Sequence, residues 1–566
     1  MQLKQIILAL TLIILSFLSR LLFLDTAPHG FYRDEASVGY NAYSLIKTGR
    51  DEFGKTFPLV FEALGDYKLP VIIYATAPFT FLFGNSDFWV RFPTAVIGAL
   101  TPLALYFLAS KIFNKKIAYL SSLSLAASPW HILFSRSVNE SVFSVFTFIL
   151  GFYYLILLFE KWRFKNLIFA ALLLFISFTS YRTQFVFIPL VIAATVILYH
   201  YKKQLNWTKY QKKLTLVALG IFLFFSFYTV KSAGFGRIKN IGLAQSAQLR
   251  LILEEQIRED GRQLPAVTRL FHNKLNNFLV TSGTNYVSHF DPSYLFFIGD
   301  EKSSNNSTPF MGHLLFMDLP FVLLGLIFLI RQKITSAKIL IFLWLIFGPL
   351  ASSLTVDSPS SLRNLISSVA WSMVIGYGIV QFFMLFDKKR KLQISLITFI
   401  LLLYSANFIF FLHQFFVHKK VHRPWFRDVG LKETVSQTLL LQGDYDNIVF
   451  APYPDLYIFF LHYAGIDPAF IQNRQKNIQF KDRKNEIMHL INPKYSFMEK
   501  DCILDGDKNT LYVCIKDRIP KNARVIKSVR LADDQPAFTF IDFNGKAEDL
   551  NQKFPPGYSQ YTENTN

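Results

Sequence analysis

IILALTLIILSFLSRLLFL, residues 6–24, is a long apolar run, and DTAPHGFYRDEASVGYN, residues 25–41, follows it at once. The apolar run matches the roughly 20 residues that a helix needs to cross a bilayer. The second stretch places two adjacent carboxylates, Asp34 and Glu35, close behind it. In a chain that is 52% hydrophobic and 17% charged, this pattern predicts a membrane protein with a polar cluster at a membrane boundary.

Apolar blocks of similar length recur through the first 415 residues. The first block is longer than the apolar part of a signal peptide, so it is expected to stay in the mature protein. We expect about eleven membrane spans. They are placed at residues 6–24, 88–110, 117–134, 141–159, 167–181, 184–200, 214–230, 314–330, 339–355, 365–386 and 392–413. Residues 69–84 are shorter and contain two prolines, which predicts an interfacial or re-entrant helix.

Basic residues distinguish the two faces of the predicted membrane. Alternate connections hold 18 Lys and Arg residues; these connections are residues 111–116, 161–165, 202–213, 331–338 and 388–391. The short opposite connections hold only Arg136, Arg182 and Arg363. Because connections rich in Lys and Arg stay in the cytoplasm, the N-terminus is expected inside and the Asp34 loop outside. Membrane topology thus explains the net charge of +20, and no nucleic-acid partner is predicted.

The composition changes near residue 415. Residues 1–414 are expected to form a transmembrane domain with a first outer loop and interfacial helices at 25–87 and a large outer loop at 231–313. Residues 415–566 have the composition of a soluble domain, with alternating runs that predict strands. These runs are residues 447–451, 510–515 and 537–542. The predicted fold class is therefore a polytopic α-helical membrane protein with a C-terminal extracytoplasmic α+β domain.

Polar side chains gather next to the outer ends of the predicted spans. An enzyme needs this arrangement when its substrate has a membrane-buried tail and a charged head at the interface. The candidates are Asp34, Glu35, Lys68, Arg136, Glu140, Tyr181, Arg182, His289, Asp291, His313, Asp357 and Arg363.

A sugar carried on a polyprenyl phosphate would suit this set. Its phosphate already leaves easily, so one carboxylate has only to take the acceptor proton, while cations stabilise the departing charge. Attack on the opposite face of the sugar predicts inversion. The expected catalytic carboxylates are Asp34, the base, with Glu35 and Glu140. The expected phosphate ligands are Lys68, Arg182 and Arg363. Further candidates for substrate contact are Arg136, Tyr181, His289 and His313.

Each candidate also has a structural explanation. Asp34 and Glu35 would cap a helix over residues 36–45. A lysine or arginine at a span end would snorkel to the interface, and Glu140 would complement a helix dipole. Arg20, near the outer end of the first span, would either snorkel or pair with a carboxylate of the following loop.

The sequence contains no glycine-rich phosphate loop at a strand–helix junction and no paired-histidine zinc motif. No cofactor is therefore predicted, although the clustered carboxylates leave a divalent metal open. The two cysteines, Cys502 and Cys514, bracket a turn-like stretch. The sequence allows either a disulfide between them or two free thiols.

The motifs resemble those of GT-C glycosyltransferases of the protein-O-mannosyltransferase and aminoarabinose-transferase type, including bacterial family-39/83-like enzymes. Arg33-Asp34-Glu35-Ala36 with Tyr40 is similar to the family's first-loop acidic motif. Asp66-Tyr67-Lys68-Leu69-Pro70 is similar to its Lys-Pro-Pro-type element, whose lysine contacts the donor phosphate, with Leu69 in place of one proline. The segment from Ser128-Pro-Trp-His-Ile to Glu140 resembles the one bearing a second acidic position, with Glu for Asp. The chain also resembles the bacterial relatives in three outer-loop elements: His289-Phe-Asp-Pro, Gly299-Asp300 and Asp357-Ser-Pro-Ser-Ser-Leu-Arg363-Asn.

The resemblance covers roughly residues 1–415 and implies a polyprenyl-phosphate sugar donor with inverting hexosyl or pentosyl transfer. It implies no metal, an extracytoplasmic site in the cell membrane, and a lipid, glycan or protein acceptor. Residues 415–566 receive no role from it. A lipid-linked glycan ligase or polymerase is an alternative. A flippase or transporter is another, but it would carry ionisable residues near the bilayer midplane, where the predicted spans are nearly free of charge.

Overall fold

A computed structural model of the chain describes residues 2–202, 207–233, 242–261, 264–300, 303–333, 335–474, 483–500, 502–503 and 505–547. The chain divides into two compact units. The first unit contains Met1–Pro28, Pro58–Glu62 and Asp66–Lys419; the second contains His29–Phe57, Ala63–Gly65 and Lys420–Asn566. Residues 29–57, which we assigned to the transmembrane domain, therefore have their contacts in the second unit.

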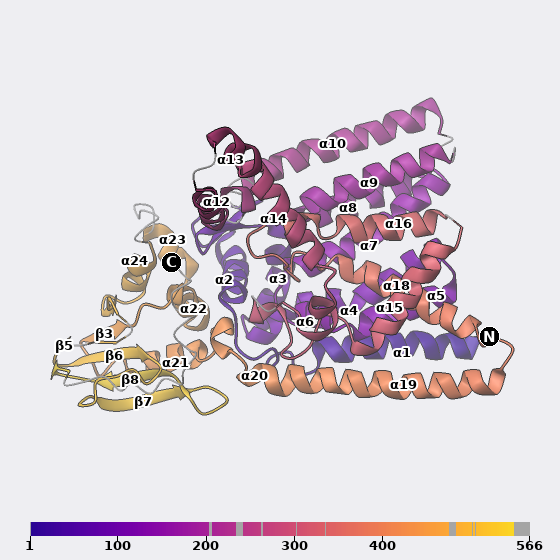
Figure 1. The fold of residues 1–566 in the computed structure, drawn as a ribbon. Coiled ribbons are helices and arrows are strands. Elements are labelled where there is room, and N and C mark those ends of the chain that lie inside the picture. Colours follow the sequence, from indigo (N-terminus) through magenta and orange to yellow (C-terminus); the bar gives the residue numbers. More distant parts are fainter. Residues whose placement is uncertain are drawn as a thin grey trace. The chain divides into compact units, whose positions relative to one another are not determined.

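The first unit is a bundle of helices (Figure 1). Its long helices are α1 (Gln2–Leu21), α3 (Pro70–Phe83), α4 (Asp87–Ile112), α5 (Lys115–Ala127), α7 (Glu140–Glu160), α8 (Phe164–Ser180), α9 (Gln184–Tyr201), α10 (Lys209–Ala233), α15 (Leu319–Arg331), α16 (Ser336–Phe347), α18 (Ser367–Met384) and α19 (Arg390–His413). The other elements of this unit are α6 (Pro129–Ser135), α12 (Ala247–Glu259), α13 (Pro265–Phe271), α14 (Lys274–Ser288), α17 (Leu350–Ser353), η1 (Leu243–Gln245), η2 (Ser293–Phe297), η3 (Ser304–Asn306), η4 (Phe316–Asp318) and η5 (Gln414–His418). The strands β1 (Phe61–Ala63) and β2 (Asp66–Lys68) pair with each other, and the sequence boundary between the two units falls within α20 (Lys419–Val421).

The membrane class is confirmed, but the predicted count of about eleven spans is not. Among the described residues, seven helices are long and apolar enough to cross a membrane, and a bent pair raises this to eight. The helices at Ile6–Leu21, Pro70–Phe83 and Phe164–Ser180 are apolar but shorter. For residues 314–330, the helix begins only at Leu319, with Pro320 in its first turn. Proline favours that position because it has no N–H to donate.

The predicted span at residues 117–134 is bent, and forms either one broken span or a re-entrant loop. The structure has two helices there, α5 and α6, bent by 57°. Pro129 causes the break, because proline has no N–H and disfavours helix in the residue before it. The backbone N–H of Trp130 then bonds the carbonyl of His313 instead of continuing the helix.

Arg20 satisfies the carbonyls that this break exposes. It lies fully buried, and its guanidinium donates to the carbonyls of Leu125 and Ala126 at 3.2 and 3.0 Å. It also lies 3.0 Å from Nδ1 of His131. Neither predicted role of Arg20 is observed: it bonds the end of a broken helix, because backbone groups without partners are costly inside a membrane protein.

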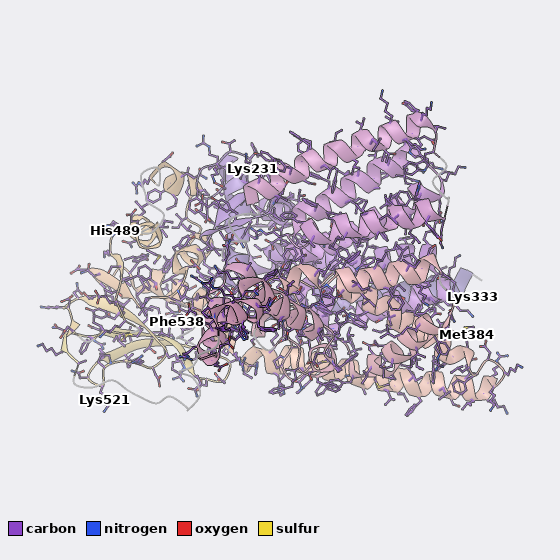
Figure 2. The ribbon with its side chains drawn as sticks, turned by 45° about the horizontal axis from the view of Figure 1, so that its top comes forward. Lys231, Lys333, Met384, His489, Lys521 and Phe538 are labelled. Carbon is purple, nitrogen blue, oxygen red and sulfur yellow. A yellow bond between two sulfur atoms is a disulfide. The ribbon has the colours of Figure 1, made fainter. Side chains whose placement is uncertain are left out.

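Helices α7 and α8 are antiparallel neighbours near the centre of the first unit (Figure 1). Gly151 allows their close approach, because a Cβ there would lie 2.9 Å from Leu174. The Ser177 hydroxyl donates to the Ser144 carbonyl at 2.8 Å. Glu140 and Tyr181 each lie one turn beyond this bond, so the start of α7 and the end of α8 meet. Lys231 and the pair Lys333 and Met384 lie towards opposite ends of the bundle (Figure 2).

The second unit contains a five-stranded sheet in the order β4-β3-β6-β8-β7. Strand β3 is parallel to β4 and β6, whereas β8 is antiparallel to β6 and β7. The strands are β3 (Asn447–Phe450), β4 (Tyr495–Phe497), β6 (Thr510–Ile515), β7 (Arg524–Arg530) and β8 (Pro536–Asp542), with a separate pair β5 (Asp505–Gly506) and β9 (Gly545–Lys546). The helices of this unit are α2 (Arg33–Thr48), η6 (Pro424–Arg427), α21 (Leu431–Leu441), α22 (Leu456–Tyr463), α23 (Pro468–Arg474) and α24 (Arg483–Ile491). The three predicted strands and the α+β class are thus confirmed.

Residues of the first loop contact distant parts of the sequence within the second unit. Helix α2 from the first loop packs on α22 and α23, although about 400 residues separate them in sequence. Phe31 stacks on His462 at 5.1 Å, and Gly30 lies where a Cβ would meet the Arg427 carbonyl at 2.5 Å. Cys502 and Cys514 form a disulfide beside β6, which decides the alternative that the sequence left open.

Candidate active site

The first turn of α2 carries the acidic motif. Glu35 is 2% exposed, and its carboxylate accepts from the Tyr32 backbone N–H at 3.0 Å and from the Arg427 guanidinium at 2.7 Å. Arg427 is itself buried and donates from Nε to the His29 carbonyl at 3.2 Å. Glu35 therefore caps the helix and pairs with a residue from the far end of the chain.

Arg33, on the other side of Asp34, is held in a similar way. Its backbone N–H and its guanidinium both reach Asp428 at 2.9 Å, and its guanidinium lies 3.4 Å from Asp455. The Tyr453 hydroxyl donates to Asp428 at 2.8 Å. Burial raises the pKa of Asp428, whereas its bonds to Arg33 and Tyr453 act in the opposite direction.

Asp34 lies between these two fixed neighbours. Its side chain is half-buried, in contrast to the fully buried Glu35. Burial, together with the charge of Asp34, raises the pKa of the Tyr32 hydroxyl, two positions earlier in the chain. Thus both neighbours of Asp34 are held by residues of the C-terminal part, while Asp34 retains partial exposure.

In the first unit, the structure brings Lys68 and Arg182 to one place. Arg182 follows the end of α8, and its guanidinium donates to the carbonyl of Tyr67, the residue before Lys68. It also lies 3.7 Å from the Asp66 carboxylate. Lys68 is 9% exposed at the end of β2, and Pro70 then begins α3 in the first-turn position that suits proline. Two predicted phosphate ligands, 114 positions apart in sequence, are therefore neighbours.

Glu140 begins α7 at the same end of the bundle, next to the meeting point of α7 and α8. It is half-buried, and its carboxylate makes no hydrogen bond or ion pair with any residue that the structure describes. The helix dipole favours a negative charge at this position. Tyr181 ends α8 immediately before Arg182. Lys68, Glu140, Tyr181 and Arg182 thus form one group of candidates.

Arg136 is fully buried and faces the protein interior. Its guanidinium donates to the carbonyls of Ser19, Leu22, Phe23 and Ala27 at 2.7–3.0 Å. It therefore binds the backbone that leaves α1. This geometry favours a structural role for Arg136 over the predicted contact with substrate.

The two candidate histidines are also buried. His289 donates from Nδ1 to the Asn285 carbonyl, and its Nε2 accepts from the Ser352 hydroxyl, both at 2.8 Å. His313 stacks against Trp130 at 4.8 Å. Burial lowers the pKa of His289 to about 4 and that of His313 to about 3. Both are therefore neutral near pH 7, and their contacts favour a structural role.

Arg363 lies in a second group, formed by the loops around Asp300 and Ser361. It donates to Thr355 and Asp357, both at 3.2 Å. Asp300 accepts from the backbone and the hydroxyl of Ser361 at 3.1 Å, and burial raises its pKa to about 6. From the sequence we named Asp300 only as part of the Gly299-Asp300 element and not as a site residue; Gly299 here has a φ of +77°.

Among the described residues, no group of three or more His, Cys, Asp or Glu side chains has the arrangement of a metal site. The candidate site residues that remain are thus carboxylates and cations near helix ends.

Known proteins provide an independent comparison. Residues 68–228 match the family model described as dolichyl-phosphate-mannose-protein mannosyltransferase. This segment includes Lys68, Glu140 and Arg182. No curated protein sequence matches the chain.

Among solved structures, ArnT from Cupriavidus metallidurans bound to undecaprenyl phosphate has a TM-score of 0.52 and 10% sequence identity, over 95% of this chain and 97% of that one. The chain has the GT-C glycosyltransferase fold. The fold is thus the one that the resemblance drawn from the motifs implied.

A second structure is the oligosaccharyltransferase of Archaeoglobus fulgidus tethered to an acceptor peptide, with a TM-score of 0.47 and 11% identity. The alignment covers 82% of this chain but only 63% of that protein, so this chain spans less than two thirds of its length.

Proposed function

We propose that this protein transfers a hexose or pentose from a polyprenyl phosphate to an acceptor at the extracytoplasmic face of the cell membrane, with inversion at the anomeric carbon. The observation that carries the proposal is the contact of Arg182 with the carbonyl before Lys68. This contact brings two cations together at one end of a GT-C bundle, within the segment that matches the mannosyltransferase family model.

The proposed step needs one base and a charge-stabilising site. An acceptor oxygen or nitrogen attacks the anomeric carbon, its proton passes to the carboxylate of Asp34, and the bond from carbon to phosphate oxygen breaks. The electron pair leaves with the polyprenyl phosphate, whose charge Lys68 and Arg182 stabilise. Because the acceptor approaches opposite the leaving group, the sugar is inverted. General-base assistance of this kind contributes about 10²–10⁴-fold.

The contacts of α2 support Asp34 rather than Glu35 as the base. Glu35 is buried in an ion pair with Arg427, so it would have to lose this partner to accept a proton. Asp34 keeps partial exposure. We assign Glu35 and Arg427 the role of positioning residues that fix the first turn of α2.

The Cys502–Cys514 disulfide supports the proposed side of the membrane, because disulfides persist outside the reducing cytoplasm. Cysteine introduced at position 140 should be labelled by an impermeant reagent from outside the cell, and cysteine at position 163 should not. Labelling of both positions from the same side would contradict the topology.

The decisive test is transfer by the purified full chain in nanodiscs, with a synthetic polyprenyl-phosphate hexose and cell-envelope extract as acceptor. Mass spectrometry identifies the sugar added, and NMR identifies its anomeric configuration. Asp34→Asn should lower turnover at least about 100-fold. Asp25→Asn, which changes an exposed carboxylate of the same loop, is the matched control and should retain activity.

Wild-type turnover by Asp34→Asn would refute the assignment of the base. Lys68→Ala should mainly raise the KM for the donor, because it removes a phosphate contact; an unchanged KM would contradict that role. Transfer of a whole oligosaccharide in one step would indicate the glycan ligase instead.

A further inference from the structure

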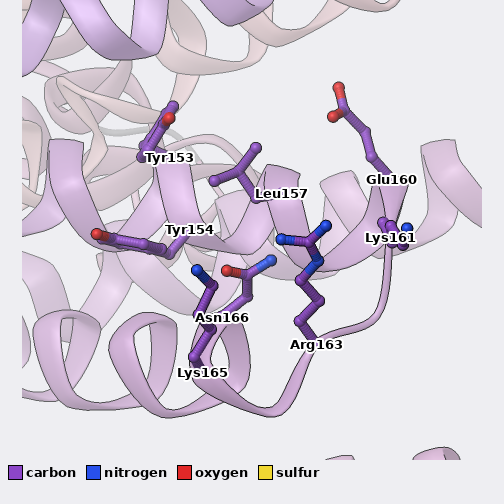
Figure 3. A pocket seen from close by; sticks show the side chains of 8 residues that line it. All are labelled: Tyr153, Tyr154, Leu157, Glu160, Lys161, Arg163, Lys165 and Asn166. Atoms are coloured by element: carbon purple, nitrogen blue, oxygen red, sulfur yellow. The ribbon is translucent and has the colours of Figure 1, made fainter.

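A polar cavity lies at the other end of α7 and α8 from the candidate site. It has a volume of about 380 Å³ and opens beside the connection between the two helices (Figure 3). The lining residues of α7 run from Tyr153 to Glu160, so the cavity is about 20–30 Å from Glu140 along that helix. The sequence predicts this end to be cytoplasmic. The cavity is therefore separate from the proposed transfer site.

Positive charge predominates in the lining. Lys161, Arg163 and Lys165 all line the cavity, and none of them forms an ion pair with a residue that the structure describes. The single lining carboxylate, Glu160, is 2.6 Å from Lys111 of α4 and is thus already paired. Three cations without an anionic partner, gathered around one cavity, are the arrangement that binds a phosphate group.

One buried polar side chain also lacks a partner. Asn166, in the first turn of α8, is 5% exposed and lines the cavity. Its side-chain amide makes no hydrogen bond with any of the described residues. Figure 3 shows its amide beside the Arg163 guanidinium, on the cavity side of the helix. An amide that reaches the cavity can donate two hydrogen bonds and accept others, so it suits a ligand with polar oxygens.

The rim of the cavity is apolar and continues into the exposed face of α8. Tyr154, which lines the cavity, stacks on Phe169 at 4.9 Å. Phe169 is 44% exposed, as are its neighbours Ile168 at 46% and Leu172 at 51%. A helix face of this kind in a membrane protein contacts acyl chains. The polar cavity and the apolar face thus adjoin, as the head and tail of a lipid do.

We propose that this cavity binds the phosphate head group of an anionic phospholipid, whose acyl chains lie along the exposed face of α8. The volume lies within the range of small-molecule sites, and basic pockets between helices on the cytoplasmic side bind anionic lipid head groups. The proposal is independent of the transfer reaction.

The test measures lipid binding to the full chain by native mass spectrometry, with phosphatidylglycerol and phosphatidylcholine as probes. The variant K161Q/R163Q/K165Q removes the three cations, all of which are exposed, so the fold should survive; the elution volume and Tm check this. The control K388Q/K389Q/K391Q removes the same charge from another connection with exposed side chains on the predicted cytoplasmic face.

The first variant should bind phosphatidylglycerol about 100-fold more weakly, the size expected when three cations near an anionic lipid are lost. The control should change binding less than about threefold, and N166A should weaken it about fivefold, as for one hydrogen bond. Equal losses in both triple variants, or equal binding of phosphatidylcholine, would overturn the proposal. Binding of inorganic phosphate at the same site, with no preference for lipid, would overturn the lipid source.

Discussion

The ion pair between Glu35 and Arg427 gives a sharp prediction about the C-terminal part of the chain. The two side chains are 2% and 9% exposed and lie 2.7 Å apart. Arg427→Gln leaves the Glu35 carboxylate buried without its partner, which costs about 3–5 kcal/mol. For a unit of 150–250 residues, each kcal/mol lowers Tm by about 2–4 °C, so we expect a fall of about 6–20 °C.

The assay is a thermal unfolding scan of the full chain in detergent, with hydrogen exchange of residues 33–48 as a local readout. Arg530→Gln is the matched control, because it breaks an exposed ion pair with Asp534 in the same unit and should cost less than about 1 kcal/mol. The double variant Glu35→Gln/Arg427→Gln removes both charges together. It should recover most of the loss, because neither buried charge then remains.

Measurements of activity distinguish a positioning role of Arg427 from a purely stabilising one. Below the unfolding temperature, Arg427→Gln should lower kcat more than KM, because it loosens the turn that carries Asp34. The reasoning would be refuted if Arg427→Gln cost no more stability than Arg530→Gln. It would also be refuted if the Glu35 and Arg427 substitutions were additive.

Three further predictions concern other parts of the fold. Arg136→Lys should destabilise the first unit by at least about 3 kcal/mol, because a single ammonium cannot serve four carbonyls; an unchanged Tm in detergent would contradict this. Burial raises the pKa of Asp300 from 3.8 to about 6, so stability should fall by about 3 kcal/mol as pH rises from about 4 through 6 and stay level above that. Asp300→Asn should abolish this part of the pH dependence in thermal scans; an unchanged slope would contradict it. Cys514→Ser should lower the free energy of unfolding by about 3 kcal/mol, because the disulfide closes a loop of 12 residues. Chemical reduction of the wild type should cost the same, and an unchanged stability in both cases would refute the prediction.

The sequence predicted most helices well where an apolar block stood alone. Residues 88–110, 141–159 and 392–413 were placed within about two residues of α4, α7 and α19, because a bilayer requires about 20 apolar residues and polar connections mark their ends. It failed where an apolar block contained a break. Residues 117–134 look continuous by composition, yet Pro129 bends them by 57°.

The candidate site was predictable only as a set of residue types. The motifs named Lys68 and Arg182 separately, and nothing in sequence joined them; the structure does so through the carbonyl of Tyr67. Likewise the sequence led us to name Asp34 as the base, but it did not predict how the burial of Asp34 differs from that of the adjacent Glu35. Their different burial depends on Arg427, 392 residues away.

The sequence by itself determined the structural class of the protein, and its chemistry stays a prediction. Long apolar blocks force helices across a membrane because backbone polar groups have no other partners there, and the acidic and basic motifs at their ends indicated sugar transfer from a lipid phosphate. The tertiary structure alone decided which polar groups are used internally. Arg20 and Arg136 became donors to backbone carbonyls, because a buried charge needs partners and folding supplies them from distant segments. For the same reason the acidic turn at residues 33–35 is held by the C-terminal part of the chain, and Asp34 is the carboxylate that this arrangement leaves half-exposed.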